Sequence, residues 1–219
     1  MPVYGLTEFI ADLYRITEEE KQGRAILRRC QPLLERLLRN PHCVPSEFKK
    51  PGANTQGRYM LHRAAKFNVN AVVWGPGHGL KAHNHETWGL VGVLENELQE
   101  TRYRRLDGGS KPGIARLELR GTTNNRAGDI SLLLPPDDIH GVLNATERNT
   151  VDIHVYGRDL VGLKRSRFDI EQNSWSDLSG AALTSSKTVW RPLPAPSTTT
   201  ASRNSSYYRR GRRLSRSMQ

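Results

Sequence analysis

The sequence contains few cysteines and no long hydrophobic run, and both absences exclude classes of protein. Only two cysteines, Cys30 and Cys43, occur in 219 residues. A disulfide framework is therefore excluded, and a reducing compartment is indicated. No stretch approaches the roughly 18 apolar residues of a transmembrane helix, and the first residues lack the basic and apolar regions of a secretory signal. These absences predict a cytoplasmic protein without a membrane partner.

Acidic residues are missing from the end of the chain, which makes the net charge misleading. The formal charge is +11, but seven of these positive charges are arginines in residues 190–219, which leaves +4 for residues 1–189. A Pro-, Ser-, Thr- and Arg-rich composition cannot bury a core, so we predict that residues 187–219 form a disordered basic tail. The run Arg209–Arg213 could bind nucleic acid. Such runs are more often solvated, so we expect no nucleic-acid partner.

Residues 1–44 have the apolar spacing of helices. Leu6–Ile16 carries apolar residues three and four positions apart. A second helix is expected from about Glu18 to Arg39, beginning with an acidic first turn that suits the helix dipole. Pro32 inside this pattern predicts a kink or a break. We therefore expect an N-terminal helical segment packed on the domain that follows.

From residue 45 to about residue 180 the pattern changes to short strands separated by turn residues. The strand candidates are residues 58–63, 69–74, 88–94, 98–106, 115–120, 130–134 and 150–156. The strand signals fade from about Ser174. Many short strands without intervening helices predict an antiparallel sandwich or barrel over residues 45–180.

Two histidines one residue apart, His83 and His85, lie in the glycine-rich stretch Trp74–Gly89. Alternate side chains of an extended strand project from the same face, so both imidazoles should face one metal ion. We expect the pair at the start of a rigid strand that continues through Thr87–Leu94. A lone pair of this kind is weak evidence, because many such histidines are ordinary surface or core residues.

A third histidine, His140, makes the spacing specific to the double motif of the cupins. The matching residues are Gly77, His83 and His85 in the first half, and Gly128, Pro135, His140 and Asn144 in the second. This resemblance implies a mainly β fold, a cupin double-stranded β-helix (jelly-roll) barrel with N-terminal α-helices. Gly89 and Leu90 occupy the positions where the motif usually has a glutamate. The expected site is therefore three neutral imidazoles with open positions, which suits iron(II), with zinc and a water as the alternative.

The sequence resembles the thiol dioxygenases of the cysteine dioxygenase family, which includes the 3-mercaptopropionate dioxygenases. The resemblance covers roughly Arg58–Phe168 and is carried by residues 74–79 (WGPGHG), 83–85 (HNH), 88–90 (WGL), 140 (H) and 154–157 (HVYG). It implies an iron(II) cupin that adds both atoms of O2 to a small thiol and produces a sulfinic acid. It also implies that His83, His85 and His140 bind Fe(2+).

Asp152, His154 and Tyr156 alternate along one expected strand, so their side chains should face the interior together. The family has a serine, a histidine and a tyrosine in this hydrogen-bonded series, and Asp152 replaces the serine. The resemblance implies that Tyr156, held by His154, donates a hydrogen bond near the bound oxygen. A carboxylate beside His154 should favour the protonated imidazole. The alternative is that the three residues only satisfy one another's hydrogen bonds.

A substrate carboxylate needs a cation, and the planar fork of arginine suits it. Arg58 falls where cysteine-specific members of the family have their carboxylate-binding arginine. Arg165 lies where the mercaptopropionate-type members have theirs. Either could instead be a solvated surface charge. The cysteine that cross-links to the tyrosine in animal members would align near Gly89, so no such cross-link is expected here.

We therefore predict a non-haem iron(II) thiol dioxygenase that acts on cysteine or 3-mercaptopropionate with O2. Two alternatives stay open at this point: another metal-dependent cupin enzyme, which uses zinc or manganese, and a non-catalytic cupin that binds a small acid. We expect the protein to be a monomer whose partners are the small thiol and O2.

Overall fold

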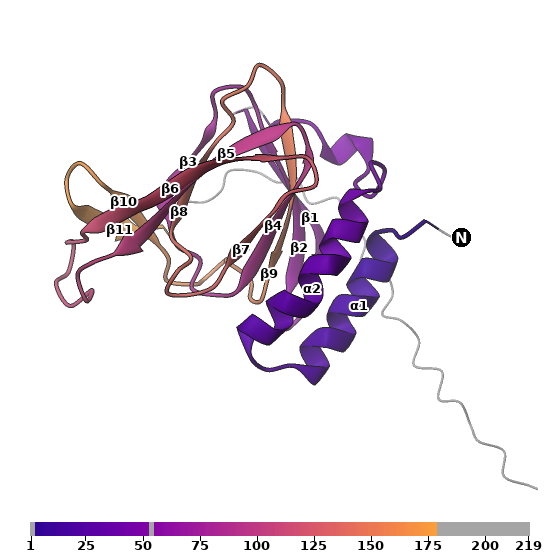
Figure 1. Ribbon diagram of the computed structural model, residues 1–219, viewed down its shortest axis with the longest axis horizontal. Helices are drawn as coiled ribbons and strands as arrows, with labels where there is room; N and C mark the ends of the chain where they lie inside the picture. Colours follow the sequence, from indigo (N-terminus) through magenta and orange to yellow (C-terminus); the bar gives the residue numbers. More distant parts are fainter. Residues whose placement is uncertain (1–2, 53–54, 179–219) are drawn as a thin grey trace, which may run out of the picture.

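The computed structural model describes residues 3–52 and 55–178 as two facing β-sheets with two helices packed against one of them (Figure 1). The five-stranded sheet contains, in spatial order, β1 (Gln56–Arg63), β2 (Asn68–Trp74), β9 (Thr150–Tyr156), β4 (Gly89–Glu95) and β7 (Ile130–Leu133). The six-stranded sheet contains β11 (Ser174–Asp177), β10 (Ser166–Asp169), β3 (Gly79–His83), β8 (His140–Leu143), β5 (Glu97–Arg105) and β6 (Leu117–Arg126). The strands within each sheet are antiparallel. The mainly β, double-stranded β-helix fold predicted from the sequence is confirmed.

The helices α1 (Leu6–Glu19) and α2 (Gly23–Leu38) differ in two details from the sequence prediction. The acidic residues end α1 and do not begin α2. Arg29 of α2 explains this, because it donates to Glu19 at 2.5 Å and to Glu20 at 2.9 Å, so the acidic residues join the two helices. Pro32 does not break α2. It lies on the exposed face, where water can satisfy the carbonyl that loses its intrahelical partner.

The main core lies between the helices and the outer face of the five-stranded sheet. Its fully buried side chains come from both layers and include Phe9, Leu13, Leu34, Val69 and Ile153. Each such side chain stabilises the fold by roughly 1.5–3 kcal/mol through removal of apolar surface from water.

A glycine in β4 brings α2 close to the sheet. A Cβ at Gly92 would lie only 2.8 Å from Cδ1 of Leu38 and 3.0 Å from Cδ2 of Leu34. Every residue of β2 and β9 is buried, because the helices cover one face of these strands and the other faces the barrel interior.

Seven of the strands overlap the predicted ones, although β6 extends six residues beyond the predicted end at residue 120, and four strands were missed. The missed strands β3, β8, β10 and β11 have four or five residues each, and glycine or charged residues interrupt their apolar pattern. The expected loss of strand structure from Ser174 is wrong, since β11 pairs with β10. The placement of His83 and His85 at the start of a strand is also wrong. His83 ends β3, and His85 lies in the loop that leads to β4.

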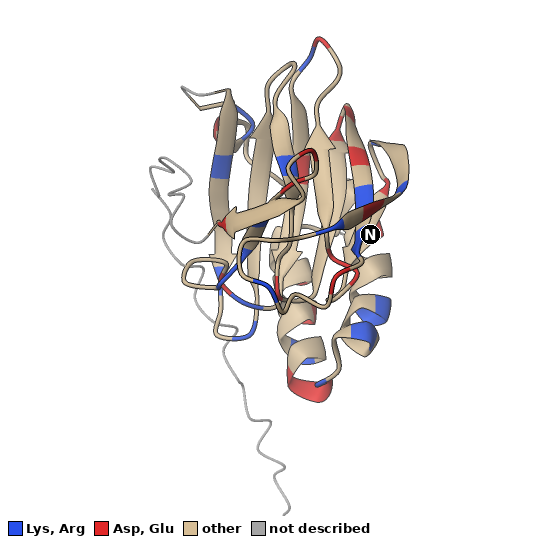
Figure 2. Cartoon of the chain, turned by 90° about the vertical axis from the view of Figure 1, so that its left-hand side faces the viewer, with Lys and Arg blue, Asp and Glu red and all other residues tan. Residues whose placement is uncertain are grey.

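The surface carries charges of both signs. On the face seen in Figure 2, basic and acidic residues are interspersed over the strands and helices. None of the helices within residues 3–52 and 55–178 is long and apolar enough to cross a membrane. The predicted boundaries at residues 44 and 180 stay predictions, and the predicted tail, residues 187–219, lies outside the described residues.

Candidate metal centre and substrate pocket

Three buried histidines converge between the two sheets. One nitrogen from each of His83, His85 and His140 lies within 4.8 Å of the others. Their ring centroids are 4.8–5.0 Å apart. Two of the three are neighbours across strands, because His83 at the end of β3 pairs with His140 at the start of β8. The structure therefore brings together the three residues that the sequence singled out as metal ligands.

Hydrogen bonds orient two of the rings toward the common centre. Nδ1 of His83 lies 2.8 Å from the carbonyl oxygen of Lys81, and Nδ1 of His140 lies 2.6 Å from Oε1 of Glu100. In both rings Nδ1 donates, which leaves Nε2 as the free acceptor for a metal.

The third ring, that of His85, is positioned through its backbone. The carboxylate of Asp138 accepts hydrogen bonds from the backbone N–H groups of His85 at 2.7 Å and of Glu86 at 3.0 Å. Asp138 is itself only 3% exposed, so this contact ties the loop after β3 to the segment that precedes β8. Nδ1 of His85 has no hydrogen-bond partner among the described residues.

Glu100 on β5 is a buried carboxylate behind the metal ligands. Besides His140, it accepts hydrogen bonds from Ser131 at 2.7 Å and Asn125 at 3.1 Å, and it pairs with Arg102 at 2.8 Å. Burial opposes its ionisation, but the bonds from His140 and Ser131 and the charge of Arg102 outweigh burial and lower the pKa of Glu100 to about 2. A carboxylate of this kind fixes the orientation of a metal-binding imidazole and increases its basicity.

The donor set fits a transition metal. Burial, together with the neighbouring histidines, holds the pKa of His83 and of His85 well below the usual value, which favours the neutral imidazole that binds metals. Among the described residues, no carboxylate joins the three-histidine group. Glu86 is exposed and accepts a hydrogen bond from Asn84, so it does not replace the missing glutamate of the cupin motif.

A polar series on β9 lies beside the histidines. Nδ1 of His154 is 2.8 Å from the hydroxyl oxygen of Tyr156, and Nε2 of His154 is 3.3 Å from Oδ2 of Asp152. The same Oδ2 accepts a hydrogen bond from the indole N–H of Trp74 at 2.7 Å. Trp74 therefore holds the carboxylate and also lines the pocket.

The charge of His154 differs from the expectation. Burial lowers its pKa and outweighs the opposing effect of Asp152, so the neutral imidazole is favoured. Burial also raises the pKa of Tyr156, which keeps the phenol protonated. The Tyr156 ring stacks on that of His85, with centroids 5.1 Å apart.

Gly89 lies against the ring of Tyr156. A Cβ at this position would be 2.7 Å from Cδ1 and 2.9 Å from Cε1 of Tyr156. The position therefore adjoins the tyrosine, as the alignment of the family's cross-linking cysteine near Gly89 implies. With glycine here, the ring carries no bond to a side chain at residue 89.

The histidines, His154 and Tyr156 share one cavity of about 560 Å³, counted with its mouth. Both candidate arginines, Arg58 on β1 and Arg165 just before β10, line this cavity as well. The remaining lining residues are mostly apolar: Val72, Trp74, Leu80, Val142, Leu160 and Leu178, with Gln56 as the other polar side chain. This lining, apolar with a few convergent polar groups, suits a small organic acid.

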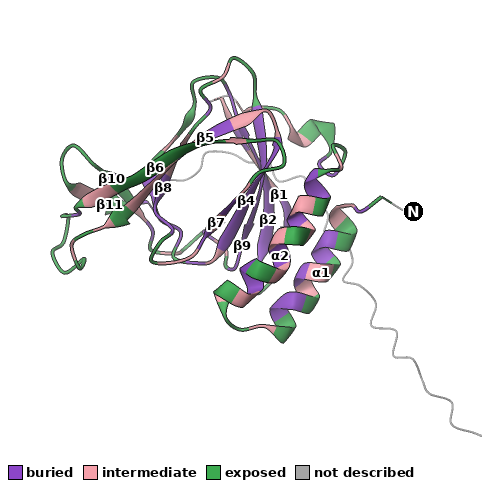
Figure 3. Ribbon diagram, viewed as in Figure 1, coloured by how far each residue is buried: buried purple, intermediate pink, exposed green. Residues whose placement is uncertain are grey.

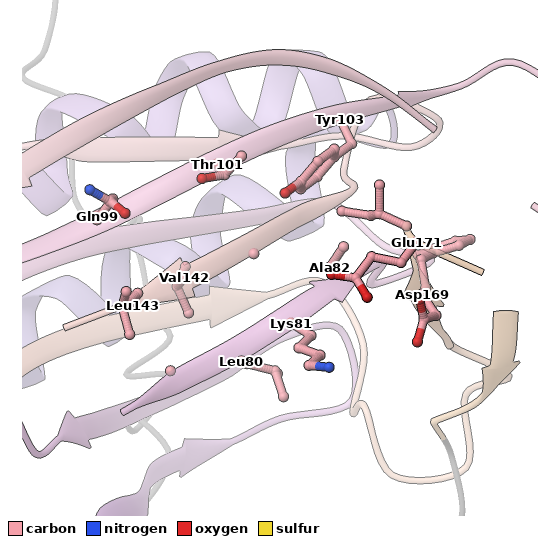
Figure 4. Close-up of a pocket in the computed structure, with 14 residues that line it drawn as sticks. Leu80, Lys81, Ala82, Gln99, Thr101, Tyr103, Val142, Leu143, Asp169 and Glu171 are labelled. Carbon is pink, nitrogen blue, oxygen red and sulfur yellow. The ribbon is translucent and has the colours of Figure 1, made fainter. Parts of the chain in front are cut away.

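A larger groove of about 1080 Å³ lies on the outer face of the six-stranded sheet (Figure 4). Gln99, Thr101 and Tyr103 of β5 line one wall, and Lys81 of β3 lines the other. No histidine lines this groove, and it is more open than the histidine cavity. The smaller cavity, which carries the metal-binding and titratable groups, is therefore the candidate site.

Two of the supporting residues, Glu100 and Asp138, were missed in the sequence, and a local signal existed for Glu100 alone. Glu100 lies in a predicted strand, two residues after the apolar Leu98, so the two side chains should share the inward face. A charged residue on an inward face indicates a buried partner. Asp138 immediately precedes the segment of His140, but its contact with the loop at His85 spans 53 positions of the chain. No local pattern identifies such a pair.

Comparisons with known proteins agree with this geometry. A model of the family described as Cysteine dioxygenase type I matches residues 45–169. The chain is 26% identical over 160 residues to cysteine dioxygenase type 1 of Danio rerio, which covers 68% of this chain and 74% of the relative.

Among solved structures, a cupin superfamily protein from Desulfitobacterium hafniense is similar at 12% identity, over 50% of this chain and 84% of that chain, with a TM-score of 0.38. A protein from Klebsiella pneumoniae with a double-stranded beta-helix domain is similar at 18% identity, over 56% and 92% of the two chains, with a TM-score of 0.41. The family resemblance noted in the sequence is confirmed by the family model, which spans more than half of the chain. This protein therefore belongs to the cysteine dioxygenase type I family and is a cupin thiol dioxygenase with a three-histidine metal-binding site.

Proposed function

We propose that the metal is iron(II) and that the enzyme oxidises a small thiol carboxylate, cysteine or 3-mercaptopropionate, to its sulfinic acid. In the balanced reaction, RSH and O2 give RSO2H, so both oxygen atoms end on sulfur, and sulfur loses the four electrons that O2 gains. One observation carries the proposal: a single small cavity gathers three imidazoles, a tyrosine hydroxyl and two guanidinium groups.

His83, His85 and His140 would hold the metal. Three imidazole ligands leave coordination positions open, and iron(II) bound there supplies a site for the thiolate and for O2. The protein contributes the orientation of the ligands, through the Lys81 carbonyl, Glu100 and the Asp138 contact.

Arg58 and Arg165 are the groups that would bind the substrate carboxylate. A guanidinium group can form two parallel hydrogen bonds with a carboxylate, which fixes the direction of the carbon chain. The thiol at the other end of a chain of two or three carbons would then point toward the histidines. Such positioning removes orientational freedom before the reaction and accelerates it.

The residues Asp152, His154 and Tyr156 would accept the thiol proton. With Asp152 ionised, its Oδ2 accepts from Trp74 and from Nε2–H of His154, so Nδ1 of His154 accepts the hydroxyl proton of Tyr156.

Tyr156 lines the cavity, and its hydroxyl oxygen keeps lone pairs that can accept a hydrogen bond from a ligand there. The thiol proton can pass to this oxygen while the Tyr156 proton moves to Nδ1 of His154 and the Nε2 proton moves to Asp152. After this transfer Tyr156 carries the former thiol proton, which it can donate as a hydrogen bond into the cavity. The family resemblance implies that Tyr156 donates a hydrogen bond near the bound oxygen. In this scheme Tyr156 acts as that donor after it has received the thiol proton.

Oxygen uptake by the purified full-length protein tests the proposal. The iron-loaded protein should consume one O2 per molecule of cysteine or 3-mercaptopropionate oxidised, and mass spectrometry should show a product 32 Da heavier than the thiol, by the stoichiometry above. Zinc-loaded protein is the matched control, because zinc fits the same ligands but has no redox chemistry. No oxygen uptake with either thiol while iron is fully bound would contradict the proposal.

We also propose that the enzyme acts as a monomer in the cytoplasm, without a nucleic-acid partner. Two features support the reducing compartment: Cys30 and Cys43 are both free and buried. Burial raises the pKa of Cys30 to about 12 and that of Cys43 to about 11, so neither thiol is reactive at neutral pH.

A further inference from the structure

Two arginines reach the substrate cavity from different sheets. Arg58 lies on β1, at the edge of the five-stranded sheet. Arg165 precedes β10, near the edge of the six-stranded sheet, where its carbonyl accepts from the backbone N–H of Leu178 at 2.8 Å. The next residue, Ser166, donates its N–H to Oδ1 of Asn84 at 2.6 Å, which anchors this segment beside the metal ligands. The two guanidinium groups therefore belong to separate walls of one cavity.

In the part of the chain that the structure describes, no carboxylate shares the cavity with the two guanidinium groups. No hydrogen bond or ion pair to either side chain is found there, and no aspartate or glutamate lines the cavity. Arg165 is 7% exposed, and its Nε lacks any hydrogen-bond partner. Asp159, which attracts Arg58 electrostatically, forms its ion pair with Arg63 at 3.1 Å instead. Asp177 attracts Arg165 electrostatically but does not line the cavity.

Arg165 is buried and Arg58 is half-buried, and the absence of an ion pair to either of them among the described residues predicts the charge of the ligand. A buried charge is costly unless an opposite charge with hydrogen bonds compensates it. A thiol monocarboxylate compensates one guanidinium and leaves the other unpaired. A ligand with two carboxylates compensates both, and each arginine can bind one carboxylate with two hydrogen bonds.

We infer that the preferred substrate is a small thiol dicarboxylate, with one carboxylate held by Arg58 and the other by Arg165. This inference rests on the proposed thiol dioxygenase function and makes its substrate class more specific. The reaction is unchanged, because RSH and O2 again give RSO2H and the second carboxylate takes no part in the redox step.

Equilibrium binding tests the two-arginine site without turnover. Succinate and propionate differ by one carboxylate and contain no thiol. By calorimetry on the metal-loaded full-length protein, succinate should bind at least about tenfold more tightly than propionate. Equal affinity for the two acids would overturn the inference.

Single substitutions distinguish a site in which each arginine binds its own carboxylate from a site in which both arginines bind the same carboxylate. Arg58→Gln and Arg165→Gln should each weaken succinate binding by at least about tenfold, and only one of the two should weaken propionate binding. Arg63→Gln is the matched control, because Arg63 lies on the same strand as Arg58 but is exposed and outside the cavity. If both cavity variants weaken propionate equally, the arginines share one carboxylate and the inference fails.

Turnover with a matched pair of thiols completes the test. The probe 2-mercaptosuccinate is 3-mercaptopropionate with one more carboxylate, on the carbon that carries sulfur. The kcat/KM of the iron-loaded protein should be at least about tenfold higher for 2-mercaptosuccinate than for 3-mercaptopropionate, because the second carboxylate pairs with the second arginine.

The two proposals fail in different ways. If 3-mercaptopropionate or cysteine is oxidised and 2-mercaptosuccinate is not, the substrate inference fails and the dioxygenase function stands. If no thiol consumes oxygen but succinate binds through both arginines, the dioxygenase function fails and the assignment of a dicarboxylate site stands.

Discussion

The two sheets of the barrel differ in how they hold the groups that face the cavity. The five-stranded sheet is covered by the helices, and its strands β2 and β9 are buried at every residue. The six-stranded sheet has an outer face open to solvent, and most residues of β6 are exposed (Figure 3). The metal ligands come from the six-stranded sheet and its adjoining loop, whereas Asp152, His154 and Tyr156 come from the five-stranded sheet.

This difference shows two ways of fixing a polar side chain inside a protein. On β9, the alternate residues Val151, Ile153 and Val155 pack against the helix side, so dense apolar packing holds the strand and hence the polar residues between them. Within residues 3–52 and 55–178, no second layer covers the outer face of the six-stranded sheet. Its histidines depend on individual hydrogen bonds, above all those of Glu100 and Asp138.

The largest effect should follow from removal of a ligand on the six-stranded sheet. His83→Ala leaves two imidazoles, and metal content should fall from about one ion per chain to less than about a tenth. Elemental analysis of the purified protein measures this content. His78→Ala is the control, because His78 is exposed and its Nδ1 lies 2.8 Å from the carbonyl oxygen of Pro76. Stoichiometric metal in the His83 variant would contradict the ligand assignment.

The next largest effect should come from a substitution on the packed face of the five-stranded sheet, and it should be a loss of stability. Ile153→Ala opens a cavity at a residue that is 0% exposed in the main core. The free energy of unfolding should fall by about 3 kcal/mol.

Leu119→Ala, on β6 of the other sheet, is the matched control. Leu119 is 61% exposed, and its truncation should change the free energy of unfolding by no more than about 0.5 kcal/mol. Urea unfolding measures both variants. If the free energy of unfolding falls by similar amounts in the two variants, the two sheets do not differ in packing as described.

A substitution on the inner face of the five-stranded sheet should lower turnover without removing the metal. Tyr156→Phe removes the hydroxyl that accepts the thiol proton, and kcat/KM should fall about 100-fold. Metal content should stay unchanged, since the ligands come from the other sheet. Tyr103→Phe is the control, because Tyr103 lines the outer groove. Undiminished turnover would exclude Tyr156 from the proton transfer, and metal loss would mean that the two sheets do not act separately.

The smallest effect should come from the hydrogen bond behind His140. Glu100→Gln keeps the shape of the side chain but removes the charge that faces Nδ1 of His140, and metal affinity should fall about tenfold. Competition with a chelator measures this affinity without turnover. Glu118→Gln, on the exposed β6, should leave it unchanged. An unaltered affinity in the Glu100 variant would show that the histidines need no such support.

Much of the fold followed from local patterns, and the failures share one cause. Apolar periodicity located both helices and seven strands, and it failed for β3, β8, β10 and β11. These short strands exist because they pair with neighbours distant in the sequence, so their own residues carry little strand signal. The end of α1 was misplaced for a similar reason, since Arg29 of the next helix binds its acidic residues.

The candidate site shows the same division. Spacing was sufficient to single out His83, His85 and His140 as candidate ligands, because a metal requires particular donor atoms and the three histidines have the spacing of the cupin motif. Spacing could not choose between Arg58 and Arg165, which lie 107 positions apart in the chain. Packing of the two sheets places both in one cavity, which no carboxylate among the described residues lines, since side chains from opposite walls meet only when the barrel closes. The number of cations that face the substrate is thus a property of the closed barrel.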